Sequence, residues 1–184
     1  RGKAPWSAPY HGEMSTPDRA PRLELVLDME TSDPDDFLTL LLLLGHPRVR
    51  LRGVTVTPGT PAQIGLVRRA LSWFAADIPV GAFNIDHPKE CVSAWHYHAY
   101  GPVPPSRDAA PGPQLLRDLC DERTTLLTGA PLRNLGAALR AGGLRLGRLV
   151  AQGGFAGEGV VPTEQQLAKF RGRVTCPSFN LNGD

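Results

Sequence analysis

The chain has 184 residues, 41% of them hydrophobic and 21% charged, with a formal net charge of +2. This balance is ordinary for a globular domain and gives no reason to expect nucleic acid or an anionic membrane surface as a partner. The longest leucine-rich run, residues 37–45, is far shorter than the roughly 20 residues that span a membrane. Three widely spaced cysteines without a CxxC pair favour isolated thiols in a reducing cytoplasm. A homo-oligomer is compatible with this composition.

Residues 1–22 are rich in proline, alanine and charged residues, without periodicity. They lack the apolar core of a signal peptide. We expect residues 1–22 to be a disordered lead, with Met14 as a candidate start of the protein. Residues 23–184 are expected to form one α/β domain.

The first expected strand covers residues 23–27, and a helix is expected after the acidic stretch that follows it. Asp33 is a suitable N-cap for this helix, and Pro34 suits the first helical position. Gly45 and Pro47 end the helix. We expect its leucines to be buried against a sheet.

The rest of the chain continues the alternation of strand and helix. Strands are expected at 49–57, 78–83, 124–129 and 146–154, and helices at 62–75, 114–121 and 130–142. Residues 84–113 are rich in proline and are expected to be an irregular loop. Strands that alternate with helices predict an α/β fold with a mostly parallel sheet flanked by helices on both faces.

An acidic cluster lies between the first expected strand and the first expected helix. Its members are Asp28, Glu30, Asp33, Asp35 and Asp36. In parallel sheets, ligands bind beyond the carboxyl ends of the strands. One interpretation is a helix cap with solvated neighbours, which accounts for Asp33 but not for the acids at the end of a buried strand. A second is a site for a hard cation such as Ca²⁺ or Mg²⁺, which would relieve the repulsion among the carboxylates.

A third interpretation is phosphoryl transfer. The stretch "LVLDMETS" loosely resembles the haloacid dehalogenase pattern, in which an apolar strand ends in DxDx[ST]. Asp28 would be the nucleophile, and Glu30 would stand at the position of the acid/base. The three interpretations remain open at the level of spacing alone.

Five segments in chain order resemble the inosine/uridine-preferring nucleoside hydrolase superfamily. They read "DMETSDPDD", "GVTVTPGTP", "TLLTGAPLRNLGAAL", "LVAQGGFAGEGVVP" and "SFNLNGD". The first resembles the signature DxDPGxDD, with one extra residue, and is closer still to a divergent branch that reads D-x-G-G-D-P-D-D. The resemblance spans residues 23–184 and implies the α/β nucleoside hydrolase fold.

The resemblance implies hydrolysis of the N-ribosyl bond of nucleosides or related compounds, with Ca²⁺ as cofactor. Glu30 and Asp36 match metal ligands of the family, and Asp28 would support them. Thr128 matches a metal ligand through its backbone carbonyl. Asp35 matches the base that removes a proton from the attacking water.

Four further residues are candidates for binding the substrate. Asn180 matches a ribose-binding asparagine of the family, and Glu158 is the nearest polar candidate after the double glycine. Asn84 follows an expected strand and could reach the site, although asparagine is also a common turn residue. His96 lies in the aromatic stretch "SAWHYHAYG", either at the mouth of the site or solvated on a packed loop.

The sequence also departs from the family. Glu30 replaces an aspartate, Thr60 stands where the family has asparagine, and Ser178 stands where a ribose-binding glutamate is usual. Members of the family run well past 184 residues, and their last metal-binding aspartate and leaving-group histidine have no counterpart here. We therefore expect the chain alone to be poorly stable or inactive. A non-catalytic ligand-binding domain on the same fold is the alternative.

Overall fold

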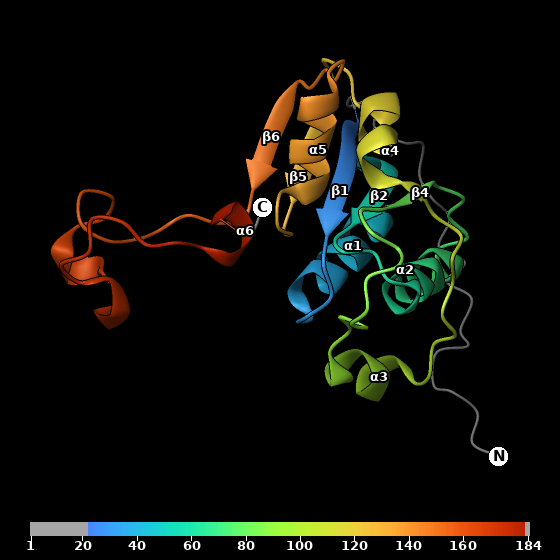
Figure 1. The fold of residues 1–184 in the computed structure, drawn as a ribbon, viewed down its shortest axis with the longest axis horizontal. Coiled ribbons are helices and arrows are strands. Elements are labelled where there is room, and N and C mark those ends of the chain that lie inside the picture. Colours follow the sequence, from blue (N-terminus) through green and yellow to red (C-terminus); the bar gives the residue numbers. More distant parts are fainter. Residues whose placement is uncertain (1–21, 183–184) are drawn as a thin grey trace.

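The computed structural model describes residues 22–182, which form an α/β domain around a parallel sheet (Figure 1). The strands in this part of the chain are β1 (Leu23–Met29), β2 (Val49–Val56), β3 (Val80–Ala82), β4 (Ala110–Pro111), β5 (Thr125–Thr128) and β6 (Arg148–Ala151). They lie in the order β4-β3-β2-β1-β5-β6, and every neighbouring pair is parallel. The predicted fold class is confirmed.

Helices cover both faces of the sheet. They are α1 (Asp35–Gly45), α2 (Pro61–Trp73), α3 (Ala94–Tyr100), α4 (Gly112–Leu119), α5 (Arg133–Ala141) and the short α6 (Phe179–Asn182), with 3₁₀ turns η1 (Thr163–Gln165) and η2 (Ala168–Phe170). Helices α1 and α2 share one apolar cluster with β1, β2 and β3. Helices α4 and α5 share a second cluster on the opposite face. No helix within residues 22–182 is long and apolar enough to cross a membrane.

Strand β1 lies at the centre of the sheet and contributes to both clusters. Leu25, Leu27 and Met29 pack toward α1 and α2, whereas Val26 packs toward α4 and α5. Side chains of a strand alternate between the faces, so a strand that is covered on both sides is apolar at consecutive positions. This burial explains the run of apolar residues that predicted the strand.

The direction of the chain across the sheet reverses next to β1. From β1 the chain proceeds through β2 and β3 to β4, and it then crosses to β5 and β6 on the other side. The connections after β1 and β5 therefore diverge to opposite sides, which leaves a crevice at the carboxyl ends of these two strands. The acidic segment directly follows β1, so the topology places it in this crevice.

Helix α1 differs from its prediction in two ways. It begins at Asp35 with Pro34 at the N-cap, and no side chain makes a capping hydrogen bond, so the assignment of Asp33 as the cap is wrong. Phe37 and Leu40 are buried, but Leu38 is 48% exposed. Only one face of a helix can contact the sheet, so a helix that is leucine-rich all around leaves leucines in solvent.

The prediction of an irregular loop over residues 84–113 is wrong in part, because this segment contains α3 and β4. Helix α3 packs its aromatic side chains on α1: the ring of Phe37 lies 5.4 Å from that of His96 and 5.1 Å from that of Tyr100. A helix this short is not stable by itself in water. The aromatic packing therefore stabilises α3. The spacing of apolar residues along the sequence does not predict this helix.

The chain after β6 extends away from the sheet before it returns at α6 (Figure 1). All four residues of β6 are exposed, with Leu149 at 45% and Val150 at 42%. The predicted disordered lead, including Met14, lies outside the described residues except for Arg22.

Candidate functional site

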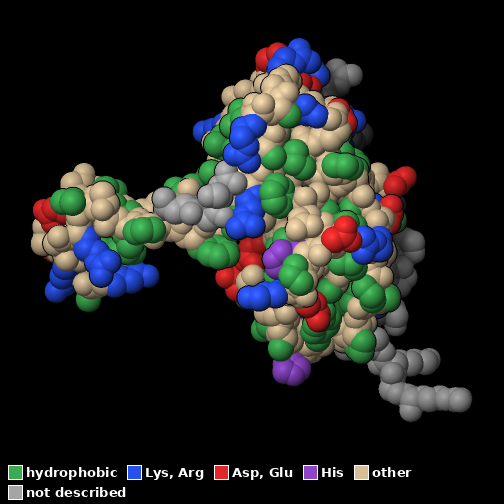
Figure 2. Space-filling view, viewed as in Figure 1, with side chains coloured by type: hydrophobic (Ala, Val, Ile, Leu, Met, Phe, Trp, Pro, Cys, Tyr) green, Lys and Arg blue, Asp and Glu red, His purple; other side chains and the backbone are tan. Residues whose placement is uncertain are grey.

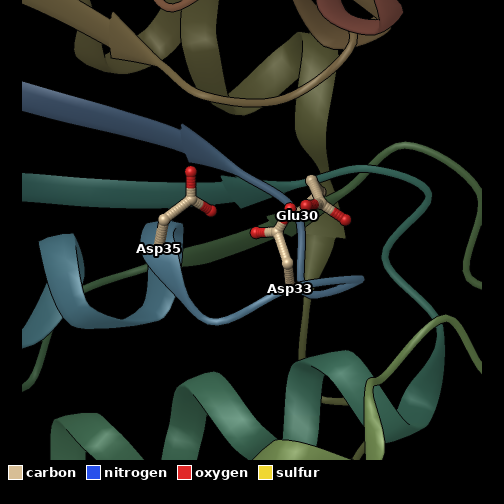
Figure 3. Close-up of side chains that lie close together, drawn as sticks. All are labelled: Glu30, Asp33 and Asp35. Atoms are coloured by element: carbon tan, nitrogen blue, oxygen red, sulfur yellow. The ribbon is translucent and has the colours of Figure 1, made fainter.

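Three carboxylates converge at the carboxyl end of β1. Glu30 directly follows the strand, Asp33 lies in the connecting loop, and Asp35 is the first residue of α1 (Figure 3). One oxygen from each lies within 4.8 Å of the others. Glu30 is only 7% exposed, whereas Asp33 and Asp35 are open to solvent. The three line a cavity of about 370 Å³, which we call the acidic cavity.

Asp33 and Asp35 are in hydrogen-bond contact and behave as a pair. The hydrogen bond to Asp35 raises the pKa of Asp33 to about 6, and the same bond lowers the pKa of Asp35. The amide of Gln152 also donates to Asp35 Oδ2 at 3.0 Å. Asp35 is therefore the member that stays ionised, as a general base must.

Asp36 lies behind this group rather than in it. Its Oδ2 accepts a hydrogen bond from the backbone N–H of Glu30 at 2.9 Å. Its Oδ1 packs so close to Gly129 that a Cβ on that glycine would lie 1.8 Å from it. Burial raises the pKa of Asp36 to about 7. Asp36 thus joins the start of α1 to the ends of β1 and β5, beside a small cavity of about 160 Å³.

Asp28 is completely buried and serves as an acceptor for three neighbouring elements. Thr55 Oγ1 and Asn134 Nδ2 donate to its Oδ1 at 2.6 and 2.9 Å, and Thr128 Oγ1 donates to its Oδ2 at 3.2 Å. Burial nevertheless raises its pKa to about 6. This carboxyl group lines neither the acidic cavity nor the small cavity beside Asp36, so it lies behind the carboxylates that face the acidic cavity.

Thr128 and Asn180 both lie next to the acids. The Thr128 carbonyl accepts a hydrogen bond from the backbone N–H of Gln152 at 2.8 Å. Asn180 lines the acidic cavity, and its amide donates to the carbonyls of Gly129 at 2.6 Å and Gln152 at 3.2 Å. The segment around Asn180 is thereby held at the ends of β5 and β6, far from its place in the sequence.

A second cavity of about 340 Å³ adjoins the first, and we call it the mixed cavity. The two share Glu30, Ser32 and Phe179 in their walls. Elsewhere the mixed cavity is lined by basic or titratable side chains, which are His87, Lys89 and Arg133, together with Cys91, Thr57, Pro58 and Pro131. Figure 2 shows acidic side chains beside histidine and Lys or Arg side chains on this face.

The buried Thr31 connects the two sides of the mixed cavity. Its hydroxyl donates to the carbonyl of Cys91 at 2.7 Å and accepts from the Gln63 amide at 3.0 Å. Its own carbonyl accepts from the backbone N–H of Ser93 at 3.0 Å. The residue after Glu30 is thus bonded directly to the loop that carries the basic residues.

Comparison with known structures decides the fold family. The chain superimposes on an inosine–uridine preferring nucleoside hydrolase from Bacillus anthracis with a TM-score of 0.54 and 26% identity, over 72% of this chain and 51% of that one. A plant nucleoside hydrolase gives a TM-score of 0.58 at 18% identity, over 72% and 48% of the two chains. The described domain has a nucleoside hydrolase-like fold.

Sequence comparison adds a relative but no activity. An uncharacterized protein of Aquifex aeolicus (strain VF5) is 29% identical over 166 residues, which make up 88% of this chain and 56% of that protein. No family model matches the chain. The nucleoside hydrolase-like chain spans about half the length of the relatives it matches.

Three predicted substrate-binding residues lie apart from the acidic cavity of this nucleoside hydrolase-like domain. Asn84 accepts from the backbone N–H of Asp86 at 3.2 Å and lines a separate cavity of about 300 Å³. Glu158 lies in the segment beyond β6, where Gln166 donates to it at 3.3 Å. His96 is fully buried, and its Nδ1 lies 2.9 Å from Ser93 Oγ.

The structure also brings in residues that the sequence reasoning did not select. Gln152 directly follows β6, so the rule that ligands bind beyond strand ends could have identified it. Asp33 was assigned to a cap, although its spacing from Glu30 and Asp35 allows convergence. His87 and Lys89 carry no comparable signal, because only the path of the loop after β3 places them near Glu30.

Proposed function

We propose that the chain is a cytoplasmic, Ca²⁺-dependent hydrolase of N-ribosyl bonds in nucleosides or related ribosyl compounds. The observation that carries the proposal is the convergence of Glu30, Asp33 and Asp35 to within 4.8 Å of one another. This convergence lies in the crevice of a nucleoside hydrolase-like fold, where ligands of parallel sheets bind.

The donor set fits a hard divalent cation. All three converging groups are carboxylates, and oxygen ligands of this kind suit Ca²⁺ better than zinc. Without a cation, like charges this close repel one another, which is consistent with the raised pKa of Asp33. The extra methylene of Glu30 is accommodated because one of its oxygens, Oε2, accepts the backbone N–H of Ser32 at 2.5 Å. When bound, the cation would lower the pKa of a water molecule and orient it.

The residues of the chain supply the rest of the chemistry. Asp35 takes the proton of the attacking water, and the Gln152 amide fixes the orientation of its carboxylate. Breaking an N-ribosyl bond builds positive charge on the sugar, and the carboxylate of Glu30 stabilises that charge from the wall of the cavity. Asn180 lies on the same wall, within reach of a ribose hydroxyl.

The phosphatase alternative fits the geometry poorly. Its nucleophile would be Asp28, which is 0% exposed and already accepts three hydrogen bonds. A nucleophile must reach the phosphorus atom, and this carboxylate faces the interior of the domain.

The test combines calcium binding with release of free base. Isothermal titration calorimetry at pH 8 should detect Ca²⁺ binding that is weakened at least tenfold in Glu30→Gln. A panel of purine and pyrimidine nucleosides, assayed for reducing sugar, should identify a cleaved substrate. The rate should fall at least a hundredfold in Asp35→Asn. Asp77 is an exposed residue between α2 and β3, at the amino ends of the strands and so away from the site. Asp77→Asn should therefore change neither measurement.

Two results would overturn the proposal. Binding of Ca²⁺ and ribose without release of base would favour the non-catalytic ligand-binding domain. Base release that persists in EDTA and in Asp35→Asn would show that neither a bound cation nor the carboxylate of Asp35 is needed for the reaction.

A further inference from the structure

The mixed cavity carries opposite charges on its walls. Glu30 contributes a carboxylate on the side shared with the acidic cavity. The positively charged side chains of Lys89 and Arg133 lie elsewhere in the wall, together with the imidazole of His87. A neutral nucleoside needs no such basic wall, whereas a ligand with a negatively charged group does.

The fold, rather than the sequence, brings these basic residues together. His87 and Lys89 belong to the loop after β3, and Arg133 is the first residue of α5, which follows β5. Their convergence from separate connections on one cavity is typical of a binding site at the carboxyl ends of a parallel sheet. Basic residues of the chain are otherwise scattered.

The backbone around Lys89 is held in place. The N–H of His87 donates to the carbonyl of Asn84 at 3.1 Å, and the N–H of Lys89 lies 3.3 Å from His87 Nδ1. On the other side, Thr60 Oγ1 donates to the carbonyl of Glu90 at 2.6 Å. Within residues 22–182 the Lys89 ammonium has no carboxylate at ion-pair distance. The backbone of Lys89 is therefore held by its loop, and its exposed ammonium group remains available to an incoming anion.

The thiol of Cys91 lies within the electrostatic range of both Lys89 and Glu30. Burial raises the pKa of this thiol, the positive charge of Lys89 lowers it, and the negative charge of Glu30 raises it. Cys91 also lines the mixed cavity. A ligand in this space would meet the carboxylate and the ammonium at the same time.

The two cavities together provide room and an apolar surface. Their volumes, about 370 and 340 Å³, fall within the range of about 300–1,000 Å³ that is usual for small-molecule sites. Phe179 is 71% exposed and lies in the wall common to both. A planar base can pack on this ring while the ribose lies at the carboxylates.

We propose that the preferred substrate is a ribosyl compound that carries an anionic group, a phosphate or a carboxylate, held by Lys89, with Arg133 and His87 in the same cavity wall. This inference rests on the proposed N-ribosyl hydrolase function and names its substrate class. The ammonium group of a lysine binds either anion as a point charge. The anion is a phosphate on the ribose or a carboxylate on the base.

Binding measurements distinguish these sources. Isothermal titration calorimetry in the presence of Ca²⁺, on the Asp35→Asn protein so that bound compounds are not cleaved, would compare inosine with inosine 5′-monophosphate, and uridine with its 6-carboxylated analogue. At least one anionic compound should bind about tenfold more tightly than its neutral partner. Tighter binding of the monophosphate alone, relative to inosine, identifies a phosphate site. Tighter binding of the carboxylated compound alone, relative to uridine, identifies a carboxylate site.

Substitutions of Lys89 test whether the higher affinity for anionic compounds depends on this side chain. Lys89→Gln should abolish the preference for the anionic compound, and Lys89→Arg should retain it. Lys169→Gln changes an exposed lysine of η2 and should leave the preference unchanged. Thermal unfolding of each variant checks that it is folded.

The outcomes separate this inference from the proposed function. Equal affinity for neutral and anionic compounds, or a preference that survives in Lys89→Gln, overturns the anionic substrate even if neutral nucleosides are cleaved. Lys89-dependent binding of an anion without release of base supports the anion site and overturns the hydrolase.

Discussion

Replacement of Asp36 by asparagine should make the chain more stable at neutral pH and should reduce the dependence of its stability on pH. The side chain of Asp36 is 5% exposed, and its Oδ2 accepts the backbone N–H of Glu30. The amide oxygen of an asparagine can accept the same hydrogen bond without burying a negative charge. The substitution therefore removes the cost of desolvation and keeps the contact.

The magnitude follows from the pKa of the carboxyl group. Burial, the largest cause, raises the pKa of Asp36 from 3.8 to about 7. Between these two values the folded chain keeps a proton that the unfolded chain has released, so its stability falls as pH rises and is lowest above pH 7. At about 1.36 kcal/mol per pH unit, the interval from pH 5.5 to 7 costs about 2 kcal/mol. A domain is stable by only about 5–15 kcal/mol, so this change is readily measured.

Urea unfolding at pH 5.5, 6.2, 7.0 and 7.5, followed by tryptophan fluorescence, measures the effect. EDTA must be present, because a bound cation would stabilise the ionised carboxylates. Wild type should lose about 2 kcal/mol more than Asp36→Asn between pH 5.5 and 7. A smaller slope should persist in the variant below pH 6, because the pKa values of Asp28 and Asp33 are also raised to about 6.

Asp77→Asn is the matched control, since Asp77 is exposed and should leave the slope of wild type unchanged. The reasoning is refuted if Asp36→Asn and wild type lose equal stability over this interval. It is also refuted if the variant is less stable than wild type at pH 7.5 while it remains folded.

Two further substitutions probe the packing behind the carboxylates. Gly129→Ala should lower the free energy of unfolding by about 1–3 kcal/mol, because its Cβ would lie 1.8 Å from Asp36 Oδ1. Gly45→Ala should be nearly neutral in the same urea titration, since its Cβ meets no atom closer than 3.5 Å, and an equal loss in both variants would contradict the steric argument. Asn134→Leu should cost about 2–4 kcal/mol at pH 8, because the buried Asp28 carboxylate loses the donor at 2.9 Å. That loss should shrink at pH 5, where Asp28 is protonated, and an equal loss at both pH values would show that the hydrogen bond to the charged form is not the cause.

The sequence predicts those elements whose pattern is set by burial in the sheet. Strand β1 is apolar at consecutive positions because both of its faces are covered, and the helices that follow the strands show ordinary amphipathic spacing. Helix α3 escapes prediction because its stability comes from rings on other elements, such as Phe37. The start of α1 differs from its prediction by one residue, and this small difference decides whether Asp33 caps a helix or faces Glu30.

The site is predictable where a strand end determines it. Glu30 and Asp35 follow from the position of the acidic stretch after β1. The interior position of Asp28 also follows from the alternation of side chains along a strand. Asp28 lies on the same face as Val26 and therefore points toward α5, where Asn134 donates a hydrogen bond to it. Lys89 could not be placed, since its distance from Glu30 depends on the three-dimensional path of a loop.

Thr31 has a consequence for the motions of the domain. Through its bonds to Cys91, Ser93 and Gln63, it joins the segment after β1 to the loop after β3 and to α2. Opening of that loop requires these bonds to break together, so the acidic and basic walls of the mixed cavity should not fluctuate independently. The backbone amide of Ser93 should therefore exchange with solvent as slowly as amides in the core, and the cavity should be formed before any ligand arrives.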